Sequence, residues 1–303
     1  MKNKVLVLGG GLSNEREVSL RSAANVTKQL RSVGCMVIET DPAAADFDLS
    51  EACKGVDIVM PILHGAGAED GGLQAQLERL GIPFLGSGSA ACALTFDKAR
   101  YRDFVAGQGV QMAAGEVVDR RSFARSKLRK KPYVLKPREG GSSVDTLILH
   151  NLADEPKLAY FDQLFTRYET MLLERLIEGQ ELTVGVLGDA ALPIILVVPP
   201  AGGTFDYENK YNGQTQEIVN PRQIAPDVQT RAQELALRLH RMTGCRHLSR
   251  SDMILTPDGE LYVLETNTIP GMTEQSLFPK MAAAAGITMP VLVEEFVSMV
   301  LQD

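Results

Sequence analysis

Two predicted strands carry oxygen-bearing side chains in a pattern that suits a divalent metal ion. Asp252 comes directly before a short apolar segment, Asp258-Gly259 can form a turn, and the returning apolar segment ends in Glu265-Thr266-Asn267. Such a hairpin brings Asp252 opposite Glu265 and Asn267, and the latter two share one face because they are two residues apart on an extended chain. Oxygen ligands suit Mg²⁺, which commonly joins carboxylates to substrate phosphates. Carboxylates on a solvated hairpin face are the alternative interpretation.

A loop rich in glycine and serine could bind an anion. Lys136-Pro137 ends a predicted strand and leads into Glu139–Ser143, here called the Gly/Ser loop. Small residues such as Gly141 let backbone N–H groups approach anionic oxygens, and the hydroxyls of Ser142 and Ser143 add donors. The lysine supplies a full positive charge. A β-hairpin turn with a surface lysine would have the same composition, so both interpretations stay open.

Two familiar nucleotide motifs are excluded. A P-loop needs a Gly-Lys dipeptide followed by serine or threonine, and this sequence contains no Gly-Lys pair. The dinucleotide pattern begins at Gly9 and Gly11, but Asn14 stands where its third glycine belongs. A nucleotide would therefore have to bind through a different arrangement.

The first third of the chain alternates predicted strands and helices. Val5–Leu8 is a buried strand, followed by glycines and by a helix that Asn14 can cap, with Glu17 three residues later as in a capping box. Val56–Leu63 is a second strand, which ends at His64-Gly65. A helix with leucines on one face and the short strand Ile82–Leu85 follow. Alternation of this kind predicts an α/β unit with a parallel sheet.

The rest of the chain predicts two further units. A helix starts at Lys98, and Tyr133–Lys136 with Leu147–Leu149 forms a hairpin-like element. We expect domains over residues 1–97, 98–182 and 183–303. A loop over residues 199–221 is rich in Pro, Gly, Asn and Thr and carries Lys210 and Tyr211, which is unlike a passive linker.

Composition excludes several classes of protein. The 303 residues carry a formal net charge of -7, and the most basic stretch, Arg120 to Lys131, is better explained as a solvated helix face than as a nucleic-acid site. The four cysteines lack metal-ligand spacing and are expected to be free thiols. The first residues resemble a short strand rather than a signal peptide, and no apolar segment has the roughly 20 residues of a spanning helix. We expect a cytoplasmic protein with no nucleic-acid or membrane partner.

Together these motifs resemble a known family. Lys98, Lys136, the Gly/Ser loop and the Asp252…Glu265-x-Asn267 set are similar to the ATP-grasp fold. The strings GGLSNEREVSL, LHGAGAEDG, KPREGGSSV, KYNGQTQ and ETNTIPGMTEQSL resemble the D-alanine–D-alanine ligase family, and they extend from Gly10 to Leu277. The resemblance implies an N-terminal parallel α/β domain followed by a two-lobed, α+β ATP-grasp fold.

The resemblance implies a nucleotide and metal site. Lys98 and Lys136 would hold ATP phosphates, and Lys210 would reach the γ-phosphate. Glu174 would accept from the adenine amino group, the backbone at Ile177 would complete that edge, and Glu181 would bind the ribose. The metal set would hold two Mg²⁺ ions, for which Mn²⁺ could substitute, through Asp252, Glu265 and Asn267.

It also implies the substrates and their contacts. ATP would drive the joining of two D-alanine molecules through an acyl-phosphate, in a homodimeric enzyme of peptidoglycan synthesis. Glu15 would anchor the ammonium of the first D-alanine, with Ser142 and Tyr211 hydrogen-bonded around it and His64 nearby. Arg250 and the backbone of Gly271 would stabilise the oxyanion. The carboxylate of the second amino acid would be received by Ser276 and Leu277.

Some positions differ from the family pattern. Asp145 and Ser249 stand where glycine is usual, and Gln275 stands where histidine is frequent. These departures keep two alternatives open. One is an ATP-grasp ligase that uses another D-amino acid or amine acceptor, and the other is a non-catalytic nucleotide-binding relative.

Overall fold

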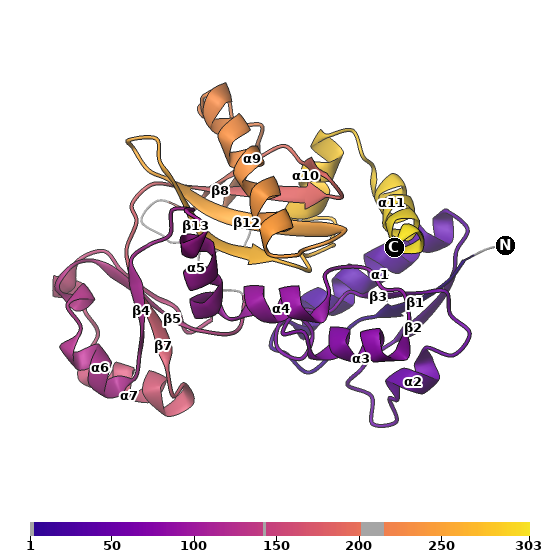
Figure 1. Cartoon of the computed structure of the whole chain (residues 1–303), viewed down its shortest axis with the longest axis horizontal. Helices are drawn as coiled ribbons and strands as arrows, with labels where there is room; N and C mark the ends of the chain where they lie inside the picture. Colours follow the sequence, from indigo (N-terminus) through magenta and orange to yellow (C-terminus); the bar gives the residue numbers. More distant parts are fainter. Residues whose placement is uncertain (1–2, 142–143, 201–214) are drawn as a thin grey trace.

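Three β-sheets organise the described part of the chain. The computed structural model describes residues 3–141, 144–200 and 215–303. We call its sheets the N-terminal sheet, with strand order β2-β1-β3, the central sheet, β4-β7-β5-β6, and the large sheet, β11-β10-β8-β12-β13 with β9 beside β8. Figure 1 shows the central sheet at one end of the molecule, the N-terminal sheet at the other and the large sheet above and between them.

The N-terminal sheet is parallel, as the alternating pattern predicts. Its strands are β1 (Lys4–Leu8), β2 (Met36–Thr40) and β3 (Ile58–Pro61). Its helices are α1 (Arg16–Ser32), α2 (Leu49–Ala52) and α3 (Gly72–Leu80). The strand expected at Ile82–Leu85 is reduced to one parallel bridge, between Val59 and Phe84. The mixed α/β and ATP-grasp expectation for the chain is confirmed.

The start of α1 differs from the predicted capping box. The residue before the helix is Glu15, and no side chain caps the first turn. Ser13 shapes the turn instead, because its Oγ accepts from the Glu15 N–H at 3.2 Å and donates to the His64 carbonyl at 2.6 Å. The prediction for Asn14 and Glu17 is therefore wrong. A contact with the segment after β3 replaces the local cap.

The central sheet is antiparallel and packs on two helices. Its strands are β4 (Gly115–Val118), β5 (Tyr133–Pro137), β6 (Leu147–Leu149) and β7 (Met171–Arg175). The helical segments are α6 (Arg120–Arg125), η1 (Leu128–Lys130), η2 (Leu152–Asp154) and α7 (Leu158–Arg167). The pairing of β5 with β6 confirms the expected hairpin-like element.

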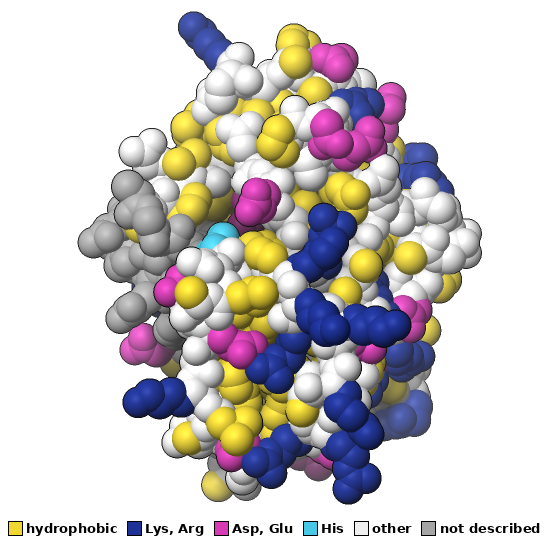
Figure 2. Space-filling view, turned by 90° about the vertical axis from the view of Figure 1, so that its left-hand side faces the viewer, with side chains coloured by type: hydrophobic (Ala, Val, Ile, Leu, Met, Phe, Trp, Pro, Cys, Tyr) yellow, Lys and Arg dark blue, Asp and Glu magenta, His cyan; other side chains and the backbone are white. Residues whose placement is uncertain are grey.

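The basic stretch from residue 120 to 131 lies on the outside of this unit. Arg121, Arg125 and Lys131 are exposed. Phe123 is buried among aromatic neighbours, and the Arg129 guanidinium lies 4.5 Å from its ring centroid while pairing with Glu155 at 2.6 Å. Figure 2, which faces this unit, shows Lys and Arg side chains spread over its surface. The arrangement fits a solvated face with one anchoring ring.

The large sheet carries the predicted metal hairpin. Its strands are β8 (Gln180–Leu187), β9 (Ala190–Ala191), β10 (Ile195–Val198), β11 (Gln216–Val219), β12 (Leu248–Leu255) and β13 (Leu261–Asn267). Helix α9 (Pro226–Met242) covers one face, and α4 (Ser89–Phe96), α5 (Lys98–Gly107) and α10 (Leu277–Ala284) lie around it. The boundary predicted between residues 182 and 183 falls inside β8.

The loop expected over residues 199–221 is shorter than predicted at its C-terminal end. β11 lies inside that range and pairs antiparallel with β10, Val219 opposite Ile195 and Gln216 opposite Val198. This pairing depends on a partner strand elsewhere in the sequence, so the local composition does not reveal it. Lys210 and Tyr211 lie outside the described residues.

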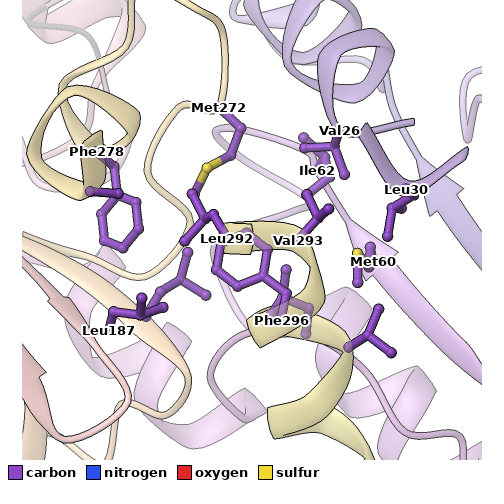
Figure 3. Close-up of a cluster of buried hydrophobic side chains, with 14 of the residues drawn as sticks. Val26, Leu30, Met60, Ile62, Leu187, Met272, Phe278, Leu292, Val293 and Phe296 are labelled. Carbon is purple, nitrogen blue, oxygen red and sulfur yellow. The ribbon is translucent and has the colours of Figure 1, made fainter. Parts of the chain in front are cut away.

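The C-terminal helix α11 (Met289–Gln302) joins the N-terminal and large sheets in one core. Figure 1 places it beside α1, from the opposite end of the sequence. Figure 3 shows Leu292, Val293 and Phe296 of α11 between side chains of the first unit, such as Val26, and those of the third, such as Phe278. A linear division of the chain cannot show this contact.

The described residues give two further findings. No single helix among them is long and apolar enough to cross a membrane; only α10 and α11 taken together reach that length and hydropathy, and they meet at a bend of 99°. All four cysteines are free thiols, as expected, and Cys53, Cys92 and Cys245 are buried.

Phe296→Ala should test the joining role of α11. The side chain is fully buried, so its truncation is expected to lower the free energy of unfolding by roughly 3–5 kcal/mol. Glu295→Ala, on the exposed face of the same helix, is the control and should change it by less than about 0.5 kcal/mol. Chemical denaturation followed by circular dichroism measures both; equal stability of the two variants would show that α11 does not hold the core.

Candidate active site

A cavity of about 400 Å³, here called the main cavity, lies where the three units meet. Its wall includes Ser13 and Gly65 from the first unit, Lys136 from the second and Asp252 from the third. Eight of the predicted site residues line it: Lys98, Lys136, Gly141, Glu174, Ile177, Glu181, Asp252 and Glu265. The structure thus brings together side chains that are separated by more than half of the sequence.

A small cavity of about 40 Å³ shares part of that wall. Lys98, Gly141 and Glu265 line both cavities, whereas Asn267 and Glu69 line only the small one. Asn267 therefore faces the site from the side of Glu69, next to Glu265.

Two lysines place positive charge on the main cavity. The Nζ of Lys136 on β5 lies 2.7 Å from Oε2 of Glu174 on the neighbouring strand β7; Glu174 is buried and Lys136 is largely buried. The Nζ of Lys98 donates to the Gly140 carbonyl and lies 3.9 Å from Oε2 of Glu265. Cations of this kind, beside a glycine-rich backbone, could bind phosphate oxygens.

The first turn of α5 fixes Lys98. The Asp97 carboxylate accepts from the Ala99 and Arg100 N–H groups, at 3.0 and 3.2 Å, and pairs with the Arg138 guanidinium at 2.5 Å. The Lys98 N–H donates to the Arg138 carbonyl at 2.8 Å. The helix start is thereby tied to the segment that follows β5, which keeps the two lysines on the same cavity.

The predicted hairpin has Asp252 directly opposite Glu265. Asn267 is two residues beyond Glu265 on β13 and therefore lies opposite Arg250, so the expectation that Asp252 lies opposite Asn267 is wrong. A bulge between Asp252 and Met253 shifts the register, and this shift sets Asp252 opposite Glu265 instead of Leu264. Asp252 accepts from Nε and Nη2 of Arg250, at 2.9 and 2.8 Å, and from the Thr183 hydroxyl at 2.5 Å. Asn267 Oδ1 accepts from the Ile269 N–H at 2.8 Å.

These oxygen donors fit Mg²⁺ in type and placement. Two carboxylates and an amide on paired strands are the hard ligands that this ion prefers. Within the described ranges, no group of three or more His, Cys, Asp or Glu side chains is arranged to hold a metal ion. Asp252 would then share its oxygens between a metal ion and Arg250.

Arg250 is a buried cation among carboxylates. Burial acts to lower its pKa, but the charges of Asp252, Glu265 and Glu69 outweigh burial and raise the pKa above its ordinary value. The guanidinium therefore stays charged, and it lies close enough to His64 to lower the pKa of that residue. A fixed positive charge in a dry site can stabilise an oxyanion.

His64 is neutral in this environment. Burial lowers its pKa to about 4. The charge of Arg250 acts in the same direction, whereas a hydrogen bond with the Ile269 backbone acts against it. Its Nε2 has no hydrogen-bond partner among the described residues. A buried ring nitrogen in that state is a ready partner for a bound polar group.

Glu69 belongs to the site and was missed by the sequence analysis. Burial, then the charge of Glu15, raises its pKa to about 8, so the carboxyl is largely protonated at neutral pH. One oxygen accepts from the Gly65 N–H at 2.5 Å. Its position inside the string LHGAGAEDG was the available signal, but nothing in that string separates it from Asp70.

Glu15 contacts glycines from two units. A Cβ atom on Gly141 would lie 2.8 Å from Glu15 Oε2, and one on Gly65 would lie 3.2 Å from it. The carboxylate therefore packs against backbone from the Gly/Ser loop and from the segment after β3. A larger residue at Gly141 would have to displace the Glu15 carboxylate, and the φ of +78° at Gly65 favours glycine there.

The Gly9–Gly11 turn that precedes Glu15 is held by Asp41. Its carboxylate accepts from the Gly11 N–H at 3.0 Å and pairs with Arg16 at 2.5 Å. The hydrogen bond from Arg16, which outweighs burial, lowers the pKa of Asp41 to about 2. A Cβ atom on Gly10 would lie 2.6 Å from that carboxylate, and its φ of +91° also requires glycine.

Gly271 and Ser276 lie close together on the loop after β13. A Cβ atom on Gly271 would lie 2.8 Å from Ser276 Oγ, which also accepts from the Thr273 N–H at 3.1 Å. Ser276 precedes the first residue of α10, Leu277. Neither Ser276 nor Leu277 lines the main or the small cavity. Ser142 and Ser143, like Lys210 and Tyr211, lie outside the described residues.

Helix α1 holds the same loop from the other side. The Met272 N–H donates to Ser22 Oγ at 3.1 Å, and the Asn25 side chain donates to the Met272 carbonyl at 2.8 Å. Both bonds are buried. The helix that starts after Glu15 therefore also fixes the backbone next to Gly271.

Comparison with known proteins agrees with this geometry. The family model described as "D-ala D-ala ligase C-terminus" matches residues 112–298. The D-alanine–D-alanine ligase of Azorhizobium caulinodans is 42% identical over 299 residues, covering 97% of this chain and 96% of that protein. That of Xanthobacter autotrophicus is 41% identical over 299 residues, with the same coverage of 97% and 96%. The chain belongs to the D-alanine–D-alanine ligase family.

Solved structures of this family have the same fold. D-alanine–D-alanine ligase from Bacillus anthracis superposes with a TM-score of 0.86 at 29% identity, covering 99% of this chain and 98% of that one. Its complex with ATP gives a TM-score of 0.85 at 28% identity, with 100% and 98% coverage. The VanG D-Ala:D-Ser ligase from Enterococcus faecalis gives 0.82 at 26% identity, with 99% and 100% coverage.

One departure from the family pattern, Ser249, has a structural explanation, and the nearby His247 also makes a contact between units. Ser249 is buried, and its Oγ lies 2.7 Å from Nδ1 of His240, which ties β12 to α9. His247 Nδ1 accepts from the Gly86 N–H at 2.9 Å and its Nε2 lies 2.8 Å from Asp303, so it joins the first unit to the end of α11. Gln275 is exposed, and nothing in the structure explains it.

Buried neutral histidines should make the protein sensitive to acid. Burial lowers the pKa of His64 and of His240 from 6.5 to about 4. As the pH falls from about 6.5, the unfolded chain takes up these protons before the folded protein does. Stability is therefore lost between pH 6.5 and 4, on the order of 3 kcal/mol for each ring at the lower end.

The contribution of His240 can be isolated. His240→Asn keeps a polar atom near the Nδ1 position but cannot titrate, so its melting temperature should fall less between pH 7 and pH 4 than that of the unmodified protein. Thermal unfolding across this range measures the difference. Parallel curves for the two proteins would contradict the proposed acid sensitivity.

Proposed function

We propose that this enzyme joins two molecules of D-alanine, with ATP converted to ADP and phosphate, to supply D-alanyl-D-alanine for peptidoglycan synthesis. The observation that carries the proposal is the main cavity, where two lysines face two carboxylates at the meeting point of three units, in a chain 42% identical to a D-alanine–D-alanine ligase. Its volume of about 400 Å³ lies in the range of ligand sites.

ATP occupies the main cavity in this proposal. Val134, Ile148 and Leu264 offer apolar surface to the adenine. Glu174 accepts from its amino group while remaining paired with Lys136, since a carboxylate can accept several hydrogen bonds. The backbone at Ile177 completes that edge.

The sugar and the phosphates extend from the adenine toward the metal hairpin. Glu181 binds the ribose, and Lys98, Lys136 and the backbone at Gly141 hold phosphate oxygens. Ser142, Ser143 and Lys210 belong to the same phosphate site in this proposal, on the resemblance of the sequence alone.

Asp252, Glu265 and Asn267 would hold two Mg²⁺ ions, which Mn²⁺ could replace, and the ions would supply positive charge to the phosphoryl group in transfer. Lys98, 3.9 Å from Glu265, adds a fixed positive charge on the same side of the cavity. Positioning and electrostatics therefore account for most of the rate in this first step.

The first D-alanine is oriented for attack by its own carboxylate. Glu15 binds its ammonium, with Ser142 and Tyr211 hydrogen-bonded around it, and neutral His64 lies near it. A carboxylate oxygen bonds to the γ-phosphorus, the bond to the ADP oxygen breaks, and D-alanyl phosphate forms.

The second D-alanine then attacks the acyl carbon through its amine. Ser276 and Leu277 receive its carboxylate. Arg250 and the Gly271 N–H stabilise the oxyanion of the tetrahedral intermediate, and Arg250 is suited to this because its charge is fixed by Asp252. Phosphate leaves, and the amine nitrogen loses a proton as the peptide bond forms.

We also propose that the enzyme is a cytoplasmic homodimer without nucleic-acid or membrane partners. The composition and the family resemblance support this description. Light scattering coupled to size-exclusion chromatography tests the dimer.

Two alternatives are separated from this proposal by one experiment. The acceptor could be another D-amino acid, since the VanG D-Ala:D-Ser ligase shares the fold at a TM-score of 0.82. The chain could also bind nucleotide without turnover, although Asp252, Glu265 and Asn267 are all present.

A panel of D-amino acids with ATP and Mg²⁺ should resolve the substrate. We expect phosphate release that requires D-alanine and a product with the mass of D-alanyl-D-alanine. Release with D-alanine plus D-serine or D-lactate, but not with D-alanine alone, would overturn the substrate assignment. ATP binding without turnover on the whole panel would overturn the enzymatic assignment.

Glu265→Ala should remove a metal ligand and lower kcat at least about 100-fold, because charge on the transferring phosphoryl group would lose its counter-charge. Asp258→Ala, on the exposed turn of the same hairpin, is the control and should keep near-normal kcat. Coupled ADP release measures both. Substantial Mg²⁺-dependent turnover by Glu265→Ala would refute the ligand role.

A further inference from the structure

Asp145 has an unusual backbone conformation next to the main cavity. Its φ is +55°, in the left-handed region, and only Asn220 and His247 share a positive φ among the described residues other than glycine. Glycine is usual at this position in the family pattern. A non-glycine residue is uncommon in that conformation, and aspartate is one of the types that tolerate it best.

The Asp145 side chain binds two neighbouring residues, Tyr168 and Arg167. Its Oδ2 accepts from the Tyr168 hydroxyl at 2.7 Å and lies 2.8 Å from an Arg167 nitrogen. The side chain is 17% exposed, against 54% for Arg167. The ion pair is therefore largely screened by water, and the bond to Tyr168 is the more protected contact.

Tyr168 is part of the cavity wall. It follows the last residue of α7 and lines the main cavity with Val144 and Thr146, the two residues that flank Asp145. Burial, then the hydrogen bond with Asp145, raises the pKa of Tyr168 to about 12, so its hydroxyl remains a donor at physiological pH.

The contact links two parts of the nucleotide site. The Val144 N–H donates to the Gly141 carbonyl at 3.4 Å, which joins the residue before Asp145 to Gly141 of the cavity wall. Asp145 then connects the turn after the Gly/Ser loop to α7 through Tyr168. Among the described residues, the bond between Asp145 and Tyr168 is the only side-chain hydrogen bond that joins this turn to Tyr168.

We propose that Asp145 is a positioning residue for the nucleotide: it holds the Tyr168 ring against the turn after the Gly/Ser loop and so increases the affinity of the main cavity for ATP. This inference rests on the proposed binding of ATP in that cavity. It assigns a role to a residue that departs from the family pattern.

The backbone allows a clean test. Asp145→Gly removes the side chain and suits a φ of +55°, so it introduces no strain of its own. Tyr168→Phe keeps the ring and removes only the hydroxyl. Asp145→Asn keeps an acceptor for Tyr168, and Arg167→Ala removes only the exposed ion pair.

We expect Asp145→Gly and Tyr168→Phe each to raise the KM for ATP and the Kd for a non-hydrolysable ATP analogue with Mg²⁺ about 5- to 10-fold. The double variant should be no worse than either single one, since both remove the same bond. The kcat at saturating ATP, the KM for D-alanine and the melting temperature should change little. Arg167→Ala should stay within about twofold, and Asp145→Asn should recover most of the affinity.

Lys136→Ala separates failure of this inference from failure of the proposed site. If Lys136→Ala loses analogue binding while Asp145→Gly and Tyr168→Phe stay within about twofold of the unmodified protein, the role of Asp145 is refuted. Additive effects in the double variant would refute it as well. If Lys136→Ala binds the analogue normally, the nucleotide is not in the main cavity and both proposals fail.

Discussion

The buried pair of Arg250 and Asp252 is the constraint around which the site is arranged. Two opposite charges taken out of water are stable only when each is well paired and hydrogen-bonded, and here both Asp252 oxygens face the guanidinium while Thr183 adds a third bond. Burial is the main reason that two nearby residues are uncharged. His64 is neutral and Glu69 is largely protonated at neutral pH, so the centre of the molecule avoids further unpaired charges.

The same arrangement explains which parts of the site were accessible from the sequence. The pairing of β12 with β13 follows from two apolar segments joined by a clear turn, and local pattern is sufficient to predict such a hairpin. The bulge between Asp252 and Met253, which sets Asp252 opposite Glu265 instead of Leu264, leaves no local signal. Glu69 was missed for a related reason. Its raised pKa comes from burial and from the charge of Glu15, which is distant in the sequence.

Elements also differed in how far sequence could predict them. Strands β1 and β5 each contain a run of apolar residues, at positions 5–8 and 133–135, and were placed well. The cap at Asn14 failed because Ser13 bonds to the His64 carbonyl, and β11 was missed because its partner is β10. In both cases a tertiary contact replaces a local preference. Asp145 is the opposite case. An aspartate where glycine is usual marked this position in the sequence, but its hydrogen bond with Tyr168 could be found only in the structure.

The packing of α11 on the N-terminal sheet has a consequence for synthesis of the protein. Residues 289–302 are synthesised after the central and large sheets. The face formed by Val26, Leu30 and Met60 therefore lacks its α11 cover until that helix has been made. At 5–20 residues per second, that delay is roughly ten seconds or more. During this interval the nascent first unit presents an apolar surface of the kind that chaperones bind.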